Sequence, residues 1–135
     1  MNIAVTNLQN KISIPQTKIT TTVNQVCGFL RLTQSKKEIS IIFVGPQRMK
    51  NVNKKFLGHD YVTDVITFDL GETAEIIICP VVALKNSKNY KQSITKEILL
   101  YVIHGLLHVA GYDDHTQPDI KRMRSKERQL LEQLA

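Results

Sequence analysis

Two histidines, a glycine and a short acidic cluster near the C-terminal end of the chain could together bind a metal ion. His104 and His108 are four residues apart inside the apolar run ILLYVIHGLLHVAGYDDH. On a helix, residues at i and i+4 project from the same face, so both imidazoles would point the same way. Gly111 is a natural C-terminal stop and would turn Asp114 or His115 back toward them. Three such side chains can hold a zinc ion and leave a fourth position for water.

The spacing is similar to that of the metzincin peptidases. Their zinc pattern is His, Glu, two residues, His, two residues, Gly, two residues, His. In this chain His104, His108 and Gly111 are in register with the pattern, and Asp114 occupies the position of the third ligand. Gly105 replaces the glutamate that would be the general base, which argues against a peptidase of this type. A helical glycine costs about 1 kcal/mol relative to alanine, so we expect Gly105 to admit a close neighbour.

The histidine pair also has a simpler interpretation. Many helices carry such pairs by accident, and their imidazoles are then hydrogen-bonded core residues that bind no ion. The glycine turn and the Asp-Asp-His cluster at residues 113–115 favour the metal site. The expected cofactor is one zinc ion, with other divalent metals left open, since an aspartate ligand suits several of them.

The composition is typical of a soluble globular protein. The 135 residues, 42% of them hydrophobic, are enough for one domain with a core that needs no disulfides. Cys27 and Cys79 lie in no CxxC pattern, and we expect them to be buried in a reducing cytoplasm. The N-terminal segment has no signal-peptide pattern, and no membrane partner is expected. The net charge of +6 favours a polyanionic partner.

Hydrophobic periodicity predicts the elements that would position this site. Strands are predicted at residues 3–8, 12–14, 38–44, 65–70 and 75–79. Helices are predicted at residues 17–32, 46–57 and 81–90, then from an N-cap at Thr95 to Gly111, and from a capping box at Thr116 onward. This order predicts an α/β (α+β) fold over residues 1–135, with a small mixed β-sheet on which the helices pack, one of them a zincin-like metal helix.

The last predicted helix is strongly basic on one side. Its cationic side chains are either an ordinary solvated face or a patch that faces RNA, and they are Lys121, Arg122, Arg124, Lys126 and Arg128.

With these residues in view, the chain resembles the YbeY family of bacterial metal-dependent endoribonucleases. The segment HGLLHVAGYDDH is similar to the family's zinc signature, His-Gly-x-Leu-His-Leu-x-Gly-Tyr-Asp-His. FLGHDYVTDVITF is similar to its second motif, which is centred on Thr-Asp-Val. AEIIIC lies where the family usually has Gly-Asp-Ile followed by an apolar strand and a cysteine. The resemblance extends from about Met49 to the C-terminus.

The resemblance implies that His104 and His108 are the first two zinc ligands. The family's last histidine falls on Asp114, and His115 comes one position later, so either side chain is the third ligand. Many members also carry an arginine where this chain has Leu57, and such an arginine would bind a phosphate beside the metal. The second motif also matches at Asp60, Thr63 and Asp64, to which we assign no catalytic role.

The function implied by the resemblance is single-strand-specific, metal-dependent cleavage of RNA. The expected process is maturation of the 16S ribosomal RNA 3′ end and ribosome quality control in the cytoplasm. Ribosomal RNA and the small ribosomal subunit are the expected partners, and DNA is not. The alternative is a non-catalytic, zinc-containing factor for ribosome assembly or RNA binding, and Leu57 is its best support.

Overall fold

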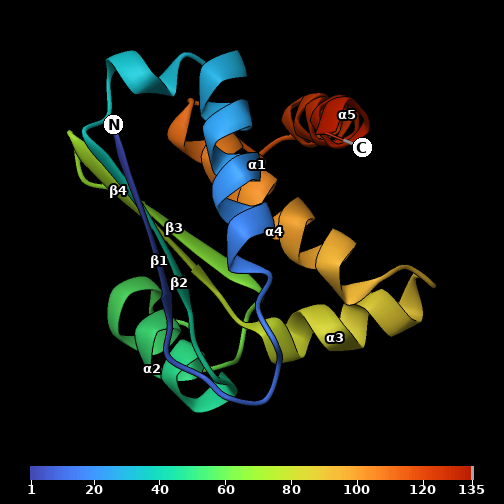
Figure 1. The fold of residues 1–135 in the computed structure, drawn as a ribbon. Helices are drawn as coiled ribbons and strands as arrows, with labels where there is room; N and C mark the ends of the chain where they lie inside the picture. Colours follow the sequence, from blue (N-terminus) through green and yellow to red (C-terminus); the bar gives the residue numbers. More distant parts are fainter. Residues whose placement is uncertain (135) are drawn as a thin grey trace.

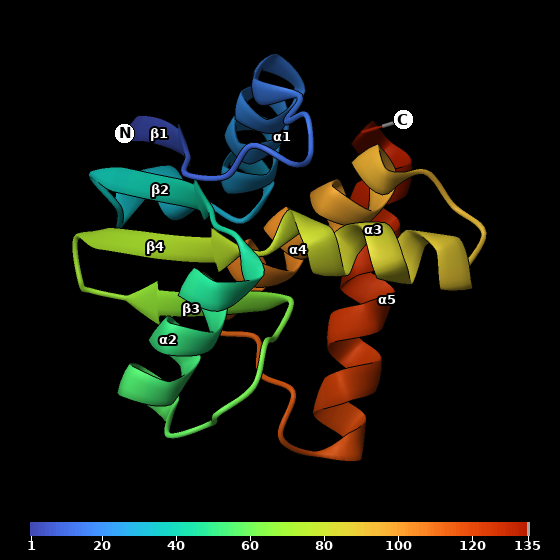
Figure 2. The same ribbon diagram turned by 90° about the horizontal axis from the view of Figure 1, so that it is seen from below.

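The computed structural model describes residues 1–134, which form one four-stranded sheet and five α-helices. The strands are β1 (Asn2–Asn7), β2 (Glu38–Phe43), β3 (Val65–Asp69) and β4 (Thr73–Ile78). Their order in the sheet is β1-β2-β4-β3, as Figure 2 shows. β1, β2 and β4 are parallel, while β3 runs antiparallel to β4. The small mixed sheet predicted from the sequence is therefore confirmed.

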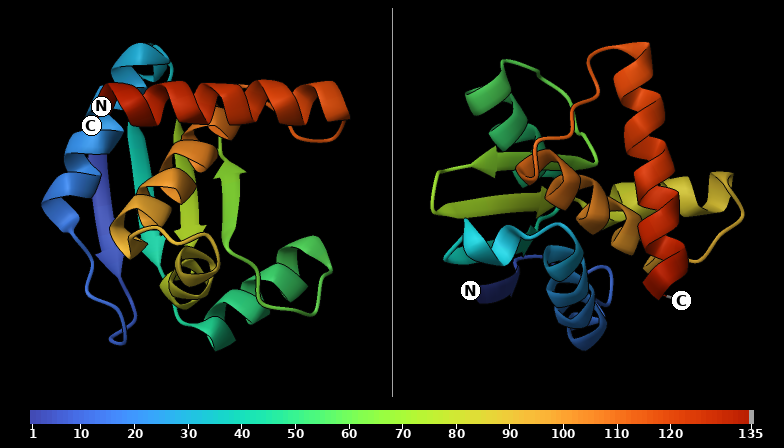
Figure 3. Two further views of the ribbon diagram at one scale, coloured as in Figure 1. Left: turned by 90° about the vertical axis from the view of Figure 1, so that its right-hand side faces the viewer. Right: turned by 90° about the horizontal axis from the view of Figure 1, so that it is seen from above.

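The helices cover both faces of this sheet. They are α1 (Gln16–Phe29), α2 (Pro46–Leu57), α3 (Pro80–Asn89), α4 (Ile94–Val109) and α5 (Gln117–Leu134), with a short 3-10 turn at Leu32–Gln34. Figure 1 shows α1 and α4 on one face and α2 on the other. α5 packs on α4 and crosses it (Figure 3). α4 is thus enclosed between the sheet and the neighbouring helices.

Successive side chains of β4 point to opposite faces of the sheet and pack in two separate clusters. Ile76 and Ile78 of β4 are fully buried in the main core, which α1 and α4 complete. Ile77 points the other way and joins a smaller cluster with Met49 of α2. The Ile-Ile-Ile run is therefore a strand covered on both faces, as its lack of alternation predicts.

The start of α4 differs from the prediction. Ser93 and not Thr95 is the N-cap, because the Ser93 hydroxyl oxygen accepts a hydrogen bond of 3.1 Å from the Lys96 N–H. The helix therefore begins at Ile94, one residue before the predicted cap. Gly105 faces the sheet, where a methyl group on it would lie 2.7 Å from Ile76 Cγ2. The close neighbour predicted at this glycine is a side chain of β4.

A predicted strand at residues 12–14 is wrong, because this segment has no regular structure. The Ile12 and Ile14 side chains pack at the edge of the main core, so their alternation reflects burial without strand pairing. Cys27 and Cys79 are both buried and unpaired, as predicted, and burial raises the pKa of the Cys27 thiol to about 11. Among the described helices, none has the length and apolar character needed to span a membrane.

Candidate functional site

The end of α4 and the turn after it bring three potential ligands together. His104 and His108 lie on one face of the helix, and their Nε2 atoms are 3.1 Å apart. Gly111 has a φ of +100°, a backbone conformation that favours glycine, and it redirects the chain after the helix. Asp114 then places its Oδ2 atom 3.7 Å from His104 Nε2 and 3.6 Å from His108 Nε2. The predicted turn back toward the histidines is present.

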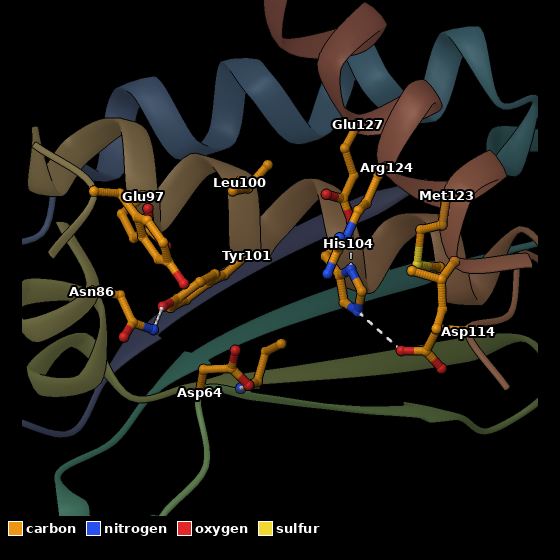
Figure 4. A pocket seen from close by; sticks show the side chains of 13 residues that line it. Asp64, Asn86, Glu97, Leu100, Tyr101, His104, Asp114, Met123, Arg124 and Glu127 are labelled. Carbon is orange, nitrogen blue, oxygen red and sulfur yellow. Dashed lines mark hydrogen bonds and ion pairs between the residues drawn. The ribbon is translucent and has the colours of Figure 1, made fainter. Parts of the chain in front are cut away.

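Hydrogen bonds on the far side of each ring orient the two imidazoles. His104 Nδ1 lies 2.5 Å from Oε1 of Glu127 in α5, and Figure 4 shows His104 between Glu127 and Asp114. His108 Nδ1 lies 3.2 Å from the backbone carbonyl of Tyr112. Both partners are acceptors, so each Nδ1 carries the proton and donates it. Both Nε2 atoms therefore present a lone pair toward Asp114.

This donor set fits a divalent cation. Three acceptor groups converge, namely two imidazole nitrogens and one carboxylate, and their ligand atoms lie within 4.8 Å of one another. Ligand atoms around a tetrahedral zinc ion, with bonds of about 2.0–2.1 Å, are about 3.3 Å apart, which is close to the spacing here. Mutual repulsion of the lone pairs is relieved when a cation or a proton lies among them.

The electrostatics of the two histidines differ. Burial lowers the pKa of His104, but the hydrogen bond and charge of Glu127 outweigh it, with help from Asp114 and Asp64, so the net pKa is raised. Burial and the neighbouring His104 lower the pKa of His108. A proton therefore competes for this site chiefly at His104.

His115 does not join the two histidines of α4. Its backbone N–H donates to the Asp113 carboxylate at 2.7 Å, and its exposed side chain lies in a separate group with Asp113 and Asp114. Of the two candidates for the third ligand, the structure places Asp114 next to both Nε2 atoms.

A groove of about 380 Å³ extends from His104 and Asp114 along α4 (Figure 4). Four carboxylates line it, from Asp64, Glu97, Asp114 and Glu127. Among the described residues that line it, Arg124 of α5 carries the one permanent positive charge. Asp64 is held in place because its Oδ1 accepts hydrogen bonds from the Val65 N–H at 2.7 Å and the Thr63 hydroxyl at 3.2 Å.

The sequence pattern had signals for residues that the predictions did not include. Glu127 is four residues after Met123 and three before Leu130, both fully buried, so it is a charge on the apolar stripe of α5. Glu97 is a similar case on α4, because it is buried and directly precedes the apolar run that begins at Ile98. An acidic residue on a buried stripe is expected to have a partner, and this signal identifies Glu127.

Comparison with known proteins shows the family to which this chain belongs. A family model described as Endoribonuclease YbeY matches residues 4–135. The chain belongs to this family. An Endoribonuclease YbeY from Thermodesulfovibrio yellowstonii is 31% identical over 155 residues, covering 99% of this chain and 98% of the relative. One from Thermotoga neapolitana is 40% identical over 107 residues, covering 73% of this chain and 72% of the relative.

The fold of a solved structure is also similar. The solution structure of TM1509 from Thermotoga maritima has a TM-score of 0.69 and 27% sequence identity, covering 98% of this chain and 88% of that one. The YbeY resemblance and the α/β fold predicted from the sequence are thus both confirmed.

One departure from the expected YbeY pattern gains a structural context. Leu57 is the last residue of α2, is 48% exposed and does not line the groove. The guanidinium that does line the groove belongs to Arg124 of α5, the helix that also supplies Glu127.

Proposed function

We propose that this chain is a metal-dependent endoribonuclease that cleaves single-stranded RNA at the groove beside α4. Family membership supports the RNA-cleaving activity. The observation that carries the metal dependence is the convergence of His104 Nε2, His108 Nε2 and the Asp114 carboxylate, with both imidazole tautomers set by partners outside the cluster. These three residues would hold one zinc ion or another divalent cation.

A bound zinc ion would supply a water with a pKa of about 7 and a positive charge that polarises a phosphoryl oxygen. The remaining work falls to residues of the chain. Glu127 holds the His104 ring through Nδ1, which fixes the direction of Nε2. Arg124, which lines the groove, would bind a phosphate oxygen with its planar guanidinium, a role that Leu57 cannot fill.

The charge distribution supports a nucleic-acid substrate that approaches the metal-ligand cluster from the basic side of α5. The groove itself is lined by four carboxylates, which repel a phosphate backbone, so a phosphate is attracted chiefly where Arg124 and a bound cation lie. The exposed basic side of α5 continues from that point and would hold the flanking RNA, mostly without reading bases.

Within this proposal, the substrate is the 3′ end of 16S ribosomal RNA in the small ribosomal subunit, and processing takes place in the cytoplasm. The net charge of +6 and the single guanidinium in the groove are compatible with an RNA strand as substrate. The test compares cleavage of small-subunit precursor RNA with cleavage of an unrelated single strand of equal length, and we expect the precursor to be cut faster.

Substitution of one ligand tests the catalytic proposal. His108→Ala is expected to lose both zinc, measured by elemental analysis, and cleavage of a single-stranded RNA, while circular dichroism stays that of the parent. Asp114→Ala should behave in the same way, whereas His115→Ala should keep metal and activity because its side chain lies outside the group. His59→Ala, on the exposed loop after α2, is the matched control.

Undiminished cleavage by metal-free His108→Ala would refute the mechanism. A parent protein that binds zinc and ribosomal RNA but cuts no strand, with several divalent metals supplied, would support the non-catalytic assembly factor instead.

A further inference from the structure

The groove continues beyond the metal-ligand cluster into a polar pocket that the cleavage mechanism does not use. Tyr101 and Glu97 lie three and seven residues before His104, on the same side of α4. At 1.5 Å per residue, Glu97 is about 10 Å along the helix from His104. Asn86 of α3 closes this end of the groove, and Figure 4 shows it opposite Tyr101.

The hydrogen bonds in this pocket leave it rich in acceptors. The Asn86 Nδ2 group donates to the Tyr101 hydroxyl at 2.6 Å, and the Gln92 side-chain amide donates to Glu97. Glu97 is only 3% exposed, yet its side chain lines the groove. A carboxylate has about four lone-pair sites, so Glu97 can accept further hydrogen bonds, and the Asn86 carbonyl oxygen is a second acceptor.

The size and walls of the groove suit one nucleotide. A volume of about 380 Å³ is within the range of small-ligand pockets. Tyr90, whose side chain is 72% exposed, lines the same groove and presents an aromatic ring on which a base can stack. Burial raises the pKa of Tyr101, with a lowering contribution from Asn86 and a raising one from Glu97, so its hydroxyl stays neutral.

We propose that Glu97, Asn86 and Tyr101 form a base-binding subsite for the nucleotide next to the scissile phosphate, and that it selects bases with an exocyclic amino group over uracil. The assignment rests on the proposed RNA-cleaving function. Glutamate carboxylates accept hydrogen bonds from the N4 amino group of cytosine. Uracil presents the O4 carbonyl at that position, and this oxygen would face the buried carboxylate without a proton between them.

Mononucleotide binding tests the subsite directly. The metal-loaded full chain is titrated with cytidine and uridine 5′-monophosphate. We expect cytidine monophosphate to bind about tenfold more tightly or better, the effect of one hydrogen bond to a charged group. Glu97→Gln should remove most of this preference, because an amide both donates and accepts. Lys88→Ala, on an exposed residue of α3 outside the groove, is the control and should keep it.

A second variant guards against a folding defect in Glu97→Gln. Asn86→Ala changes a half-buried side chain and should also reduce the preference for cytidine monophosphate. Equal affinities of the parent chain for the two nucleotides would overturn the proposal, and so would a preference that both variants retain.

The outcome is separable from that of the nuclease proposal, because mononucleotide binding requires no cleavage. A preference for cytidine monophosphate in a chain that never cuts RNA would refute the nuclease alone. Equal affinities in a chain that cuts RNA would refute the subsite alone.

Discussion

Replacing Gly105 with alanine tests how the metal-ligand helix sits on the sheet. Gly105 follows His104 directly and faces β4, where the Ile76 side chain leaves no room for a Cβ atom. An added methyl group would lie 2.7 Å from Ile76 Cγ2, 2.9 Å from Cδ1 and 3.0 Å from Cγ1. Ordinary contact begins at 3.4 Å, so the helix and the strand would have to separate by several tenths of an ångström.

Two opposing effects decide the sign of the change in stability. Alanine is favoured over glycine inside a helix by about 1 kcal/mol. Overpacking a filled core costs about 1–3 kcal/mol, and Ile76 is a fully buried, β-branched residue with little freedom to move. We therefore expect Gly105→Ala to lower the free energy of unfolding by up to about 2 kcal/mol.

Gly28 offers a matched control. It also lies in a helix, α1, but a methyl group there would meet nothing within 4 Å. Gly28→Ala should therefore be neutral or raise the free energy of unfolding by up to about 1 kcal/mol. Urea denaturation of both variants, with chelator present and with the slope of the transition compared, measures this difference.

A Gly105→Ala chain as stable as Gly28→Ala would refute the argument that β4 requires a glycine at this position. If the argument holds, the displaced helix should also shift His104 and His108 relative to Asp114 and Glu127, and zinc affinity should fall together with stability.

Further predictions concern the metal-ligand cluster and the groove. Glu127→Gln should weaken zinc binding about 10- to 100-fold, because it changes the partner that orients His104; competition with a chromophoric chelator measures this, and unchanged affinity would argue against the positioning role. Arg124→Ala should lower affinity for single-stranded RNA about tenfold or more, while Lys11→Ala, on an exposed residue before α1, should have a small effect in the same binding assay. Zinc affinity should fall as the pH falls through the raised pKa of His104, because a proton then occupies the ligand nitrogen; calorimetric titrations that give one affinity from pH 8 to about 6 would contradict this. Zinc at 100 times its dissociation constant should raise the free energy of unfolding by about 2.7 kcal/mol, and a chelator should reverse the gain in a thermal melt.

Local patterns predicted much of this architecture. The β-branched run at residues 38–43 and the Ile-Ile-Ile run of β4 are strands, because strand pairing and burial act on the same few residues. The errors have equally local causes. Ile12 and Ile14 alternate as in a strand but only pack at the edge of the core. Ser93, and not Thr95, is the N-cap of α4.

The sequence by itself determined the pairing of His104 and His108, since helical geometry alone places residues four apart on one face. It also determined that the chain turns after Gly111, because the left-handed conformation there favours glycine.

Only the tertiary structure decided which side chains surround that pair. The choice of Asp114 over His115 depends on the path of the turn, and the contact of Glu127 with His104 depends on how α5 crosses α4. The physical reason is that a helix specifies its own faces through a fixed period, whereas the direction in which another element approaches is set by the packing of the whole core.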